Sequence, residues 1–177
     1  KIYVINDDCN KKLVDLAIFL RNPKNKNYRI LAYIDPCGMQ LEWRSMENLK
    51  GLNIDMWVLV PTGLGVSRLL TNSGQISDAW KERLELFLGL SRDEINKIFY
   101  KEIPTLFPDL SFKEKEKDVV EKSSKLYRSR LKSVFDFVSQ PYILRNSNNT
   151  IMYHLFLASN NSTAVKIGND IVRKHNK

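Results

Sequence analysis

The sequence predicts a single α/β domain built around a mostly parallel sheet. Three short apolar runs, at residues 2–5, 30–34 and 56–60, alternate with segments whose apolar residues have helical spacing. Series of this kind form right-handed parallel strand–helix–strand units. A later pair of β-rich runs around a polar turn predicts a C-terminal antiparallel hairpin. Residues 76–138, which lie between these two parts, predict a helical insertion.

Length and composition exclude several classes of protein. A chain of 177 residues fits one domain, and 43% hydrophobic with 27% charged residues is ordinary for a globular protein and excludes a wholly disordered one. No apolar run approaches the roughly 20 residues of a membrane span. Cys9 and Cys37 have no CxxC spacing and are too few for a disulfide scaffold. We therefore expect a soluble protein in a cytoplasmic, reducing setting, with no membrane partner.

The first half of the chain predicts three strands and two helices. Residues 2–5 are β-branched and aromatic, and a helical stripe that Asn10 can cap follows at residues 13–20. The run at 30–34 is apolar throughout, which predicts a strand buried on both faces. A short helix at 43–49 leads to the third strand at 56–60.

The second half predicts helices and then the hairpin. Helices are expected around residues 79–88, from a capping box at Ser91–Glu94 to Ile103, and at 126–137, with a charged and weakly apolar stretch at 113–125. The hairpin joins residues 142–144 to 151–157. Because residues 151–157 are apolar on both faces of the predicted strand, we expect this strand to lie inside the sheet and not at its edge. Ser162 or Thr163 caps a last helix, whose expected buried stripe is Ala164, Ile167, Ile171 and Val172.

The charge of the chain favours polyanionic partners. Lys and Arg number 28 against 20 Asp and Glu, which gives a net charge of +8. Such a balance favours approach to nucleic acid, whereas the alternative is a basic surface with no such partner. In the densest region, residues 113–132, acidic and basic residues alternate, which is typical of a solvated helical face.

Several short motifs, in order along the chain, carry a resemblance to a known family. They are Asp8-Cys9-Asn10, Ile34-Asp35-Pro36 with Gly38, Asp55-Met56-Trp57 with Pro61, and Ala158-Ser159-Asn160 with a helix to Asp170-Ile171. The chain resembles the three-Cys-motif partner family, which has the fold of class I S-adenosylmethionine-dependent methyltransferases. The resemblance implies a Rossmann-like, methyltransferase-type sheet in which residues 151–157 insert antiparallel between two earlier strands.

The resemblance covers only the second half of the family pattern. Full-length relatives begin with two further strands and a glycine-rich loop for the cofactor, and none of the seven glycines here forms such a loop. The resemblance implies that residues 1–177 are the C-terminal part of a larger domain whose cofactor is S-adenosylmethionine. The strand at 30–34 would then have an open edge. The alternatives are direct pairing of residues 2–5 with 30–34, or a second subunit in a homo-oligomer.

Three sets of residues are candidates for the site. Asp35 and Pro36 follow a buried strand, where α/β sheets bind ligands, and Asp35 could accept hydrogen bonds from a target amine as a catalytic residue; the alternative is a plain turn. By resemblance Asp8 binds the cofactor adenine, unless it only caps a helix. Gly63, Gly65 and Arg68 could bind a substrate phosphate or carboxylate, or form a flexible loop.

Two functions remain open at this point. The first is an S-adenosylmethionine-dependent methyltransferase that acts on nucleic acid. The second is a non-catalytic module that binds a three-Cys-motif protein or nucleic acid. The two His and two Cys residues have no metal-ligand spacing, and His154, between apolar neighbours, is interpreted as a packed histidine.

Overall fold

The computed structural model describes residues 2–70, 77–104 and 111–175. Its main sheet is open and mixed, with strand order β1-β2-β7-β5, and β6 also pairs with β7. The strands are β1 (Ile30–Ile34), β2 (Ile54–Val60), β5 (Phe137–Val138), β6 (Tyr142–Arg145) and β7 (Ile151–Ser159). Among the described strands β1 and β2 form the parallel pair, and the pairs with β7 are antiparallel. The predicted α/β class is confirmed, with a mixed sheet.

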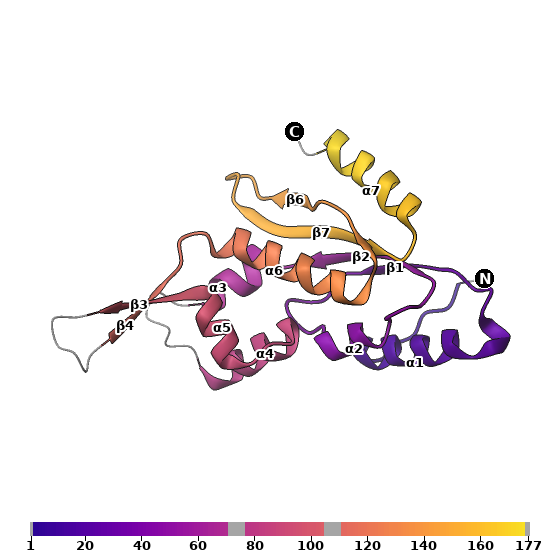
Figure 1. The fold of residues 1–177 in the computed structure, drawn as a ribbon, viewed down its shortest axis with the longest axis horizontal. Helices are drawn as coiled ribbons and strands as arrows, with labels where there is room; N and C mark the ends of the chain where they lie inside the picture. The colour runs from indigo at the N-terminus through magenta and orange to yellow at the C-terminus, as the bar shows by residue number, and fades with distance from the viewer. Residues whose placement is uncertain (1, 71–76, 105–110, 176–177) are drawn as a thin grey trace.

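The helices cover the two faces of the sheet unequally. In Figure 1, α7 (Ser162–His175) lies above the sheet, and α1 (Cys9–Arg21), α2 (Trp43–Glu47), α4 (Asp78–Leu88) and α5 (Arg92–Phe99) lie below it. Helix α6 (Val119–Val134) packs on β7 and on the π-helix η2 (Thr62–Val66). The shorter helical elements are η1 (Pro23–Asn25) and α3 (Ser67–Leu69).

The core lies between the sheet and the lower helices. Along β2, the even-numbered residues from Ile54 to Val60 are buried, as the two-residue period of a strand requires. They pack in one cluster with Trp43, Phe87 and Tyr127, whose side chain stacks on Phe87. The upper face has only α7, which packs so closely on Leu157 that Gly168 has no room for a side chain.

The predicted strand at residues 2–5 is wrong. The structure has no strand there, and the side chains of Ile2 and Val4 are more than nine-tenths exposed. β1 pairs with β2 alone, so direct pairing of residues 2–5 beside β1 is not observed. The prediction that β1 is buried on both faces is also wrong. Leu31 and Tyr33 are exposed, because α7 leaves an open apolar pocket between its residues Ile171 and Val172 and Tyr33 rather than covering the strand.

The segment 76–138 differs in detail from a purely helical insertion. The capping box of Ser91 and Glu94 is present and starts α5. This helix ends at Phe99 rather than Ile103, because β3 (Tyr100–Pro104) follows at once and pairs with β4 (Ser111–Lys115). The sequence also predicts a loop at residues 104–108, and all of it except Pro104 lies outside the described residues. Helix α6 begins at Val119, earlier than the 126 expected, and takes up part of the charged stretch.

The hairpin prediction is confirmed. β7 lies inside the sheet, between β2 and the strands β5 and β6. The last helix is also present, but its buried residues are Val165, Gly168 and Val172, whereas Ile167 and Ile171 are about half exposed. The predicted cap at Ser162 or Thr163 is wrong, because both residues are inside α7 and its first turn is capped by Asn161, whose Oδ1 accepts a hydrogen bond from the Thr163 amide at 3.0 Å.

Candidate functional site

The loop after β1 carries the strongest predicted site residue. Asp35 is exposed, whereas Pro36 beside it is buried and anchors the turn. Gly38 has a φ of +63°, a left-handed conformation that glycine adopts without strain. The Asp35 carboxylate therefore lies in solvent at the carboxyl end of a parallel strand, where it is free to accept hydrogen bonds from a ligand.

Asp8 is the N-cap of α1. Its Oδ1 accepts a hydrogen bond from the Lys11 amide at 3.0 Å, which is the capping role considered above, and Asn10 is inside the helix. Asn10 instead ties the helix to the loop after β1. Its Nδ2 donates to the Gln40 carbonyl at 2.9 Å, and its Oδ1 accepts from the Glu42 amide at 2.8 Å. This pair of bonds holds the start of α1 at the same edge as the loop of Asp35.

The glycine-rich segment after β2 forms the π-helix η2 and not a flexible loop. The amides of Gly65 and Val66 donate to the Pro61 carbonyl, so they are used within the helix. A side chain on Gly63 would collide with the carbonyl oxygen of Ile151, and one on Gly65 would lie 3.1 Å from the Met39 side chain. Gly63 is therefore needed for the close packing of η2 on β7, whereas Gly65 makes a tight contact that side chains can adjust to, and the exposed Arg68 follows in α3.

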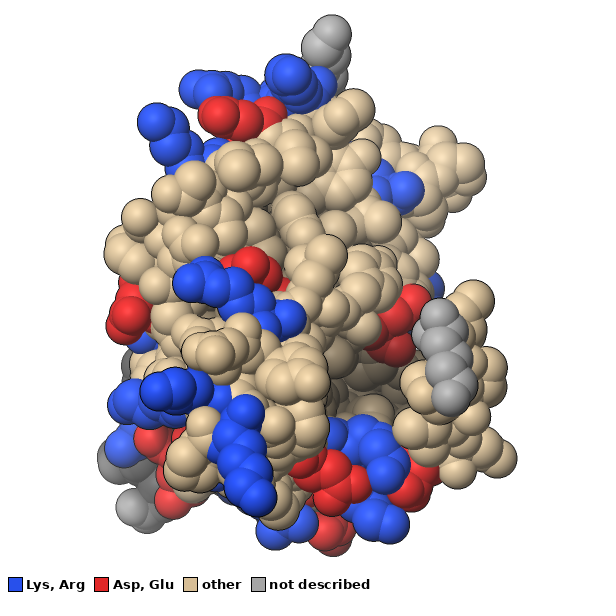
Figure 2. Space-filling view, turned by 90° about the vertical axis from the view of Figure 1, so that its right-hand side faces the viewer, with Lys and Arg blue, Asp and Glu red and all other residues tan. Residues whose placement is uncertain are grey.

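These contacts bring the predicted site segments together at one edge. The start of α1, the loop after β1 and η2 after β2 all meet at the carboxyl ends of the parallel pair. Helix-covered α/β sheets bind ligands at this edge. The opposite side of the molecule, on the right of Figure 1 where β7 ends and α7 begins, carries Lys and Arg interspersed with Asp and Glu (Figure 2), so the excess of positive charge does not form one continuous surface there.

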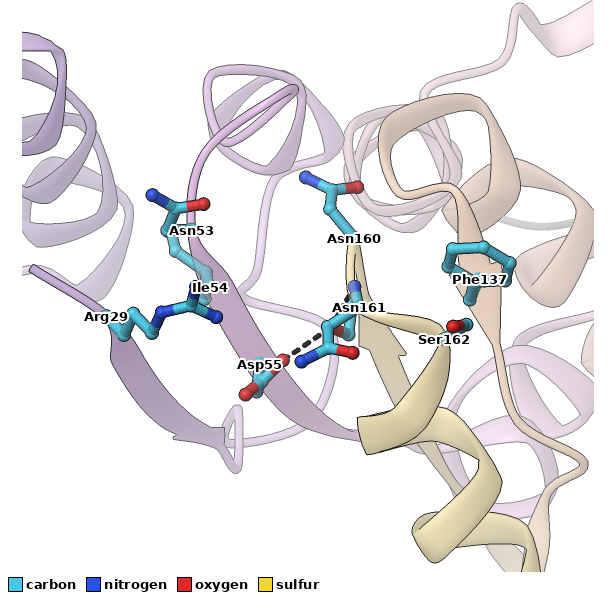
Figure 3. A pocket seen from close by; sticks show the side chains of 9 residues that line it. Arg29, Asn53, Ile54, Asp55, Phe137, Asn160, Asn161 and Ser162 are labelled. Carbon is cyan, nitrogen blue, oxygen red and sulfur yellow. Dashed lines mark hydrogen bonds between the residues drawn. The ribbon is translucent and has the colours of Figure 1, made fainter. Parts of the chain in front are cut away.

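A pocket that the sequence analysis did not predict lies at the opposite edge of the sheet (Figure 3). It has a volume of about 410 Å³. Its lining residues come from the start of β2, the end of β7 and their neighbours: Arg29, Asn53, Ile54, Asp55, Phe137, Ser159, Asn160, Asn161 and Ser162. The sequence did hold a signal for it, since Asp55 and Ser159 belong to two of the short motifs noted above.

The polar groups of this pocket bond mainly to one another. The Ser159 hydroxyl donates to Asp55 Oδ1 and accepts from the Asn161 amide at 2.8 Å. The Asn160 side chain donates to the Leu52 carbonyl and accepts from the Asp136 amide. These bonds join the amino end of β2 to the start of α7. The residues of this pocket therefore stabilise the fold. One oxygen of the Asp55 carboxylate is already hydrogen-bonded to the Ser159 hydroxyl.

His154 is buried in β7, opposite the last residue of β2. It is 4% exposed, and its Nδ1 lies 2.7 Å from the hydroxyl oxygen of Thr62, which is itself fully buried. Burial, aided by the positive charge of Arg145, lowers the pKa of His154 to about 4. The imidazole is therefore neutral at pH 7, in agreement with its interpretation as a packed histidine.

The described residues hold no group of three or more side chains that could ligate a metal ion. Cys9 and Cys37 are free and exposed. Partial burial and the adjacent Asp8 carboxylate raise the pKa of the Cys9 thiol, which makes it less reactive than an ordinary cysteine.

Comparison of this chain with family models, curated proteins and solved structures gives no match. Within the residues that the structure describes, no helix is long and apolar enough to cross a membrane. The site must therefore be interpreted from its own geometry.

Proposed function

We propose that this chain is a methyltransferase-like α/β protein of the three-Cys-motif partner type, and that its ligand edge is the one that carries Asp35. One observation carries the proposal: β7 is inserted antiparallel between β2 and β6. This order is the one that the resemblance implies for the last strand of the family. Simple doubly wound sheets do not require such an insertion, because their connections remain parallel.

A second observation supports the proposal. Two of the short motifs that suggested the family, around Asp55 and Ser159, are far apart in sequence but are paired residue for residue. The Ser159 hydroxyl also donates directly to the Asp55 carboxylate. The two motifs therefore act together in the structure, because their contact joins β2 to β7.

The residues present do not form a complete S-adenosylmethionine site. Asp8 is at the ligand edge, but its Oδ1 caps α1. Gly63 and Gly65, the glycines that follow β2, form η2 rather than an open cofactor loop, and the amide of Gly65 is bonded within η2. We therefore derive no methyl-transfer step from these residues. Asp35 is proposed to position a target amine by accepting its hydrogen bonds.

Methyl transfer by the protein expressed from its complete reading frame tests this proposal. Labelled S-adenosylmethionine is supplied with DNA or RNA, and incorporation is measured for the wild type, Asp35→Asn and Asp136→Asn. We expect Asp35→Asn to lower the rate by about 100-fold, the usual cost of a misplaced target group. Asp136, an exposed residue at the opposite edge, is the matched control. Absence of both transfer and cofactor binding in the wild type would contradict the enzymatic proposal.

The exposed face of β1 supports a second candidate, a non-catalytic binding module. Leu31 and Tyr33 leave an apolar, uncharged strand edge that another polypeptide can extend. The candidate partners are a three-Cys-motif protein or nucleic acid. Binding to nucleic acid should weaken steeply between about 50 and 200 mM salt, because each neutralised phosphate releases counterions. Binding that does not change with salt would argue against a nucleic-acid partner.

A further inference from the structure

Another pocket lies between α6 and the β6–β7 hairpin. Its volume is about 410 Å³. Helix α6 supplies four polar side chains, Glu121, Ser124, Lys125 and Arg128, and the rest of the wall consists of Gln140, Pro141, Ile143, Ile151 and His154. The α6 residues have the spacing i, i+3, i+4 and i+7, so they lie on one face of the helix. Ser124 is the buried member of this set, Arg128 is half-buried, and the Glu121 and Lys125 side chains are exposed at the mouth of the pocket.

Two buried side chains in this pocket have hydrogen-bonding capacity left over. His154 uses Nδ1 for Thr62, and its Nε2 has no partner among the described residues. Ser124 is 6% exposed, and its hydroxyl has no partner among them either, although the neighbouring Ser123 bonds to the Val119 carbonyl. Neither atom is fully enclosed, so both open onto the pocket, and polar groups on a pocket wall orient a polar ligand.

The charges around the pocket favour an anion. Arg128 is held in place because its Nε and Nη2 donate to the carbonyls of Ser139 and Val138 at 2.8 and 3.1 Å. Lys125 pairs with Glu121 at 2.7 Å, which offsets the one carboxylate of the wall. Arg145 adds a further positive charge near His154. The wall therefore carries a net positive charge and fixed donors, which suit a phosphate group.

We propose that this pocket binds a phosphate group, held by the Ser124 hydroxyl, the His154 ring N–H and the charges of Arg128 and Lys125. An anion selects one tautomer of His154. When the Thr62 hydroxyl donates to Nδ1, the ring proton lies on Nε2, where it can donate to the ligand. A pocket of about 410 Å³ whose donors converge from α6 and β7 fits a terminal phosphate, as in a phosphate monoester, better than the continuous backbone of a nucleic acid.

Calorimetric titration with inorganic phosphate, uridine 5′-monophosphate, uridine and a short oligonucleotide tests the proposal. We expect Kd values below about 1 mM for the two phosphates and none measurable for uridine. Ser124→Ala should weaken binding about tenfold, since a hydrogen bond to a charged group is lost. Ser133→Ala is the matched control, because Ser133 is on the same helix and bonds only to the Arg130 carbonyl. Lys125→Gln should weaken binding by a few fold, and the exposed Lys132→Gln should not.

Nitrogen NMR of the His154 ring gives an independent readout that a fold defect would not reproduce. Phosphate should shift the ring toward the tautomer protonated at Nε2 while Thr62 remains bonded. Binding that is equally weakened by Ser133→Ala, or no binding by either phosphate, would overturn the proposal. Equal affinity for acetate would overturn the phosphate assignment in favour of a general anion pocket. Tighter binding of the oligonucleotide than of the monoester would overturn the preference for a terminal phosphate.

Discussion

Strands β1 and β7 belong to the same sheet and are similarly apolar in sequence, yet their environments differ. β7 is nine residues long, has neighbours on both sides and buries Phe156 and Ala158 completely. β1 has one neighbour, and Leu31 is 75% exposed and Tyr33 61%. An apolar run therefore predicts a strand, but the burial of that strand depends on which strands and helices pack against it.

The first part of the described chain contributes most of the exposed apolar side chains. Of the fourteen large hydrophobic side chains that are exposed among the described residues, nine lie in the first 33 positions. They are Ile2, Tyr3, Val4, Ile5, Ile18, Phe19, Tyr28, Leu31 and Tyr33. Concentrated apolar surface of this kind marks an interface rather than ordinary surface. The N-terminal end of the fold is thus the part that another polypeptide is expected to cover.

The largest expected effect is the difference in the free energy of unfolding between a substitution in β7 and one in β1. Phe156→Ala should lower the free energy of unfolding by about 3–5 kcal/mol, because it leaves a cavity in the core. Leu31→Ala should change it by less than about 0.5 kcal/mol, since most of its side chain is already in water. Urea unfolding of both variants measures the difference. A similar loss for the two would mean that β1 is covered in solution.

A second effect depends on how closely η2 approaches β7. Gly63→Ala should destabilise the protein by about 3 kcal/mol, because its Cβ would collide with the Ile151 carbonyl, which is backbone and cannot rotate away. Gly65→Ala, in the same helix, is the control. Its new methyl group would meet the Met39 and Pro61 side chains at 3.1 Å or more, and the Met39 side chain can move. Equal unfolding free energies for the two variants would disprove the close approach.

The pH dependence of stability tests the interior of β7. The pKa of His154 is lowered from 6.5 to about 4 in the folded protein. The unfolded chain therefore binds more protons between these values, so the free energy of unfolding should fall as the pH drops from 6.5 to about 4, by roughly 2 kcal/mol. His154→Gln should flatten this part of the profile. An unchanged slope in that variant would assign the dependence to other groups.

The smallest expected effect on stability is at the edge of β1. Leu31→Lys places a charge on the open strand, which is how natural edge strands avoid pairing. The free energy of unfolding should change by less than about 0.5 kcal/mol. Self-association, measured by sedimentation, should fall. Trp80→Lys on α4, at an exposed apolar residue away from β1, is the control for a general gain in solubility. Equal loss of association in both variants would argue against pairing through β1.

Local signals predicted much of this fold. The capping box at Ser91 fixed the start of α5, and the polar turn at residues 146–149 separated β6 from β7. The failures have one physical cause. Residues 2–5 have strand propensity but no neighbouring strand, and tertiary context overrides propensity. The predicted Asp35 and Asp8 positions lie at the edge where parallel strands end, which sequence can predict, whereas the pocket of His154 and Ser124 exists only because α6 packs on β7.

The position of β7 also sets a schedule for synthesis of the chain. β2 cannot gain its antiparallel neighbour until the 90 residues from Pro61 to Thr150 have been made. At a synthesis rate of about 5–20 residues per second, β2 remains without this neighbour for some 5–20 s after it leaves the ribosome. During that interval Trp57 and the backbone groups of β2 that later bond to β7 are accessible to other chains. The nascent protein is therefore most in need of a chaperone before its C-terminal quarter emerges.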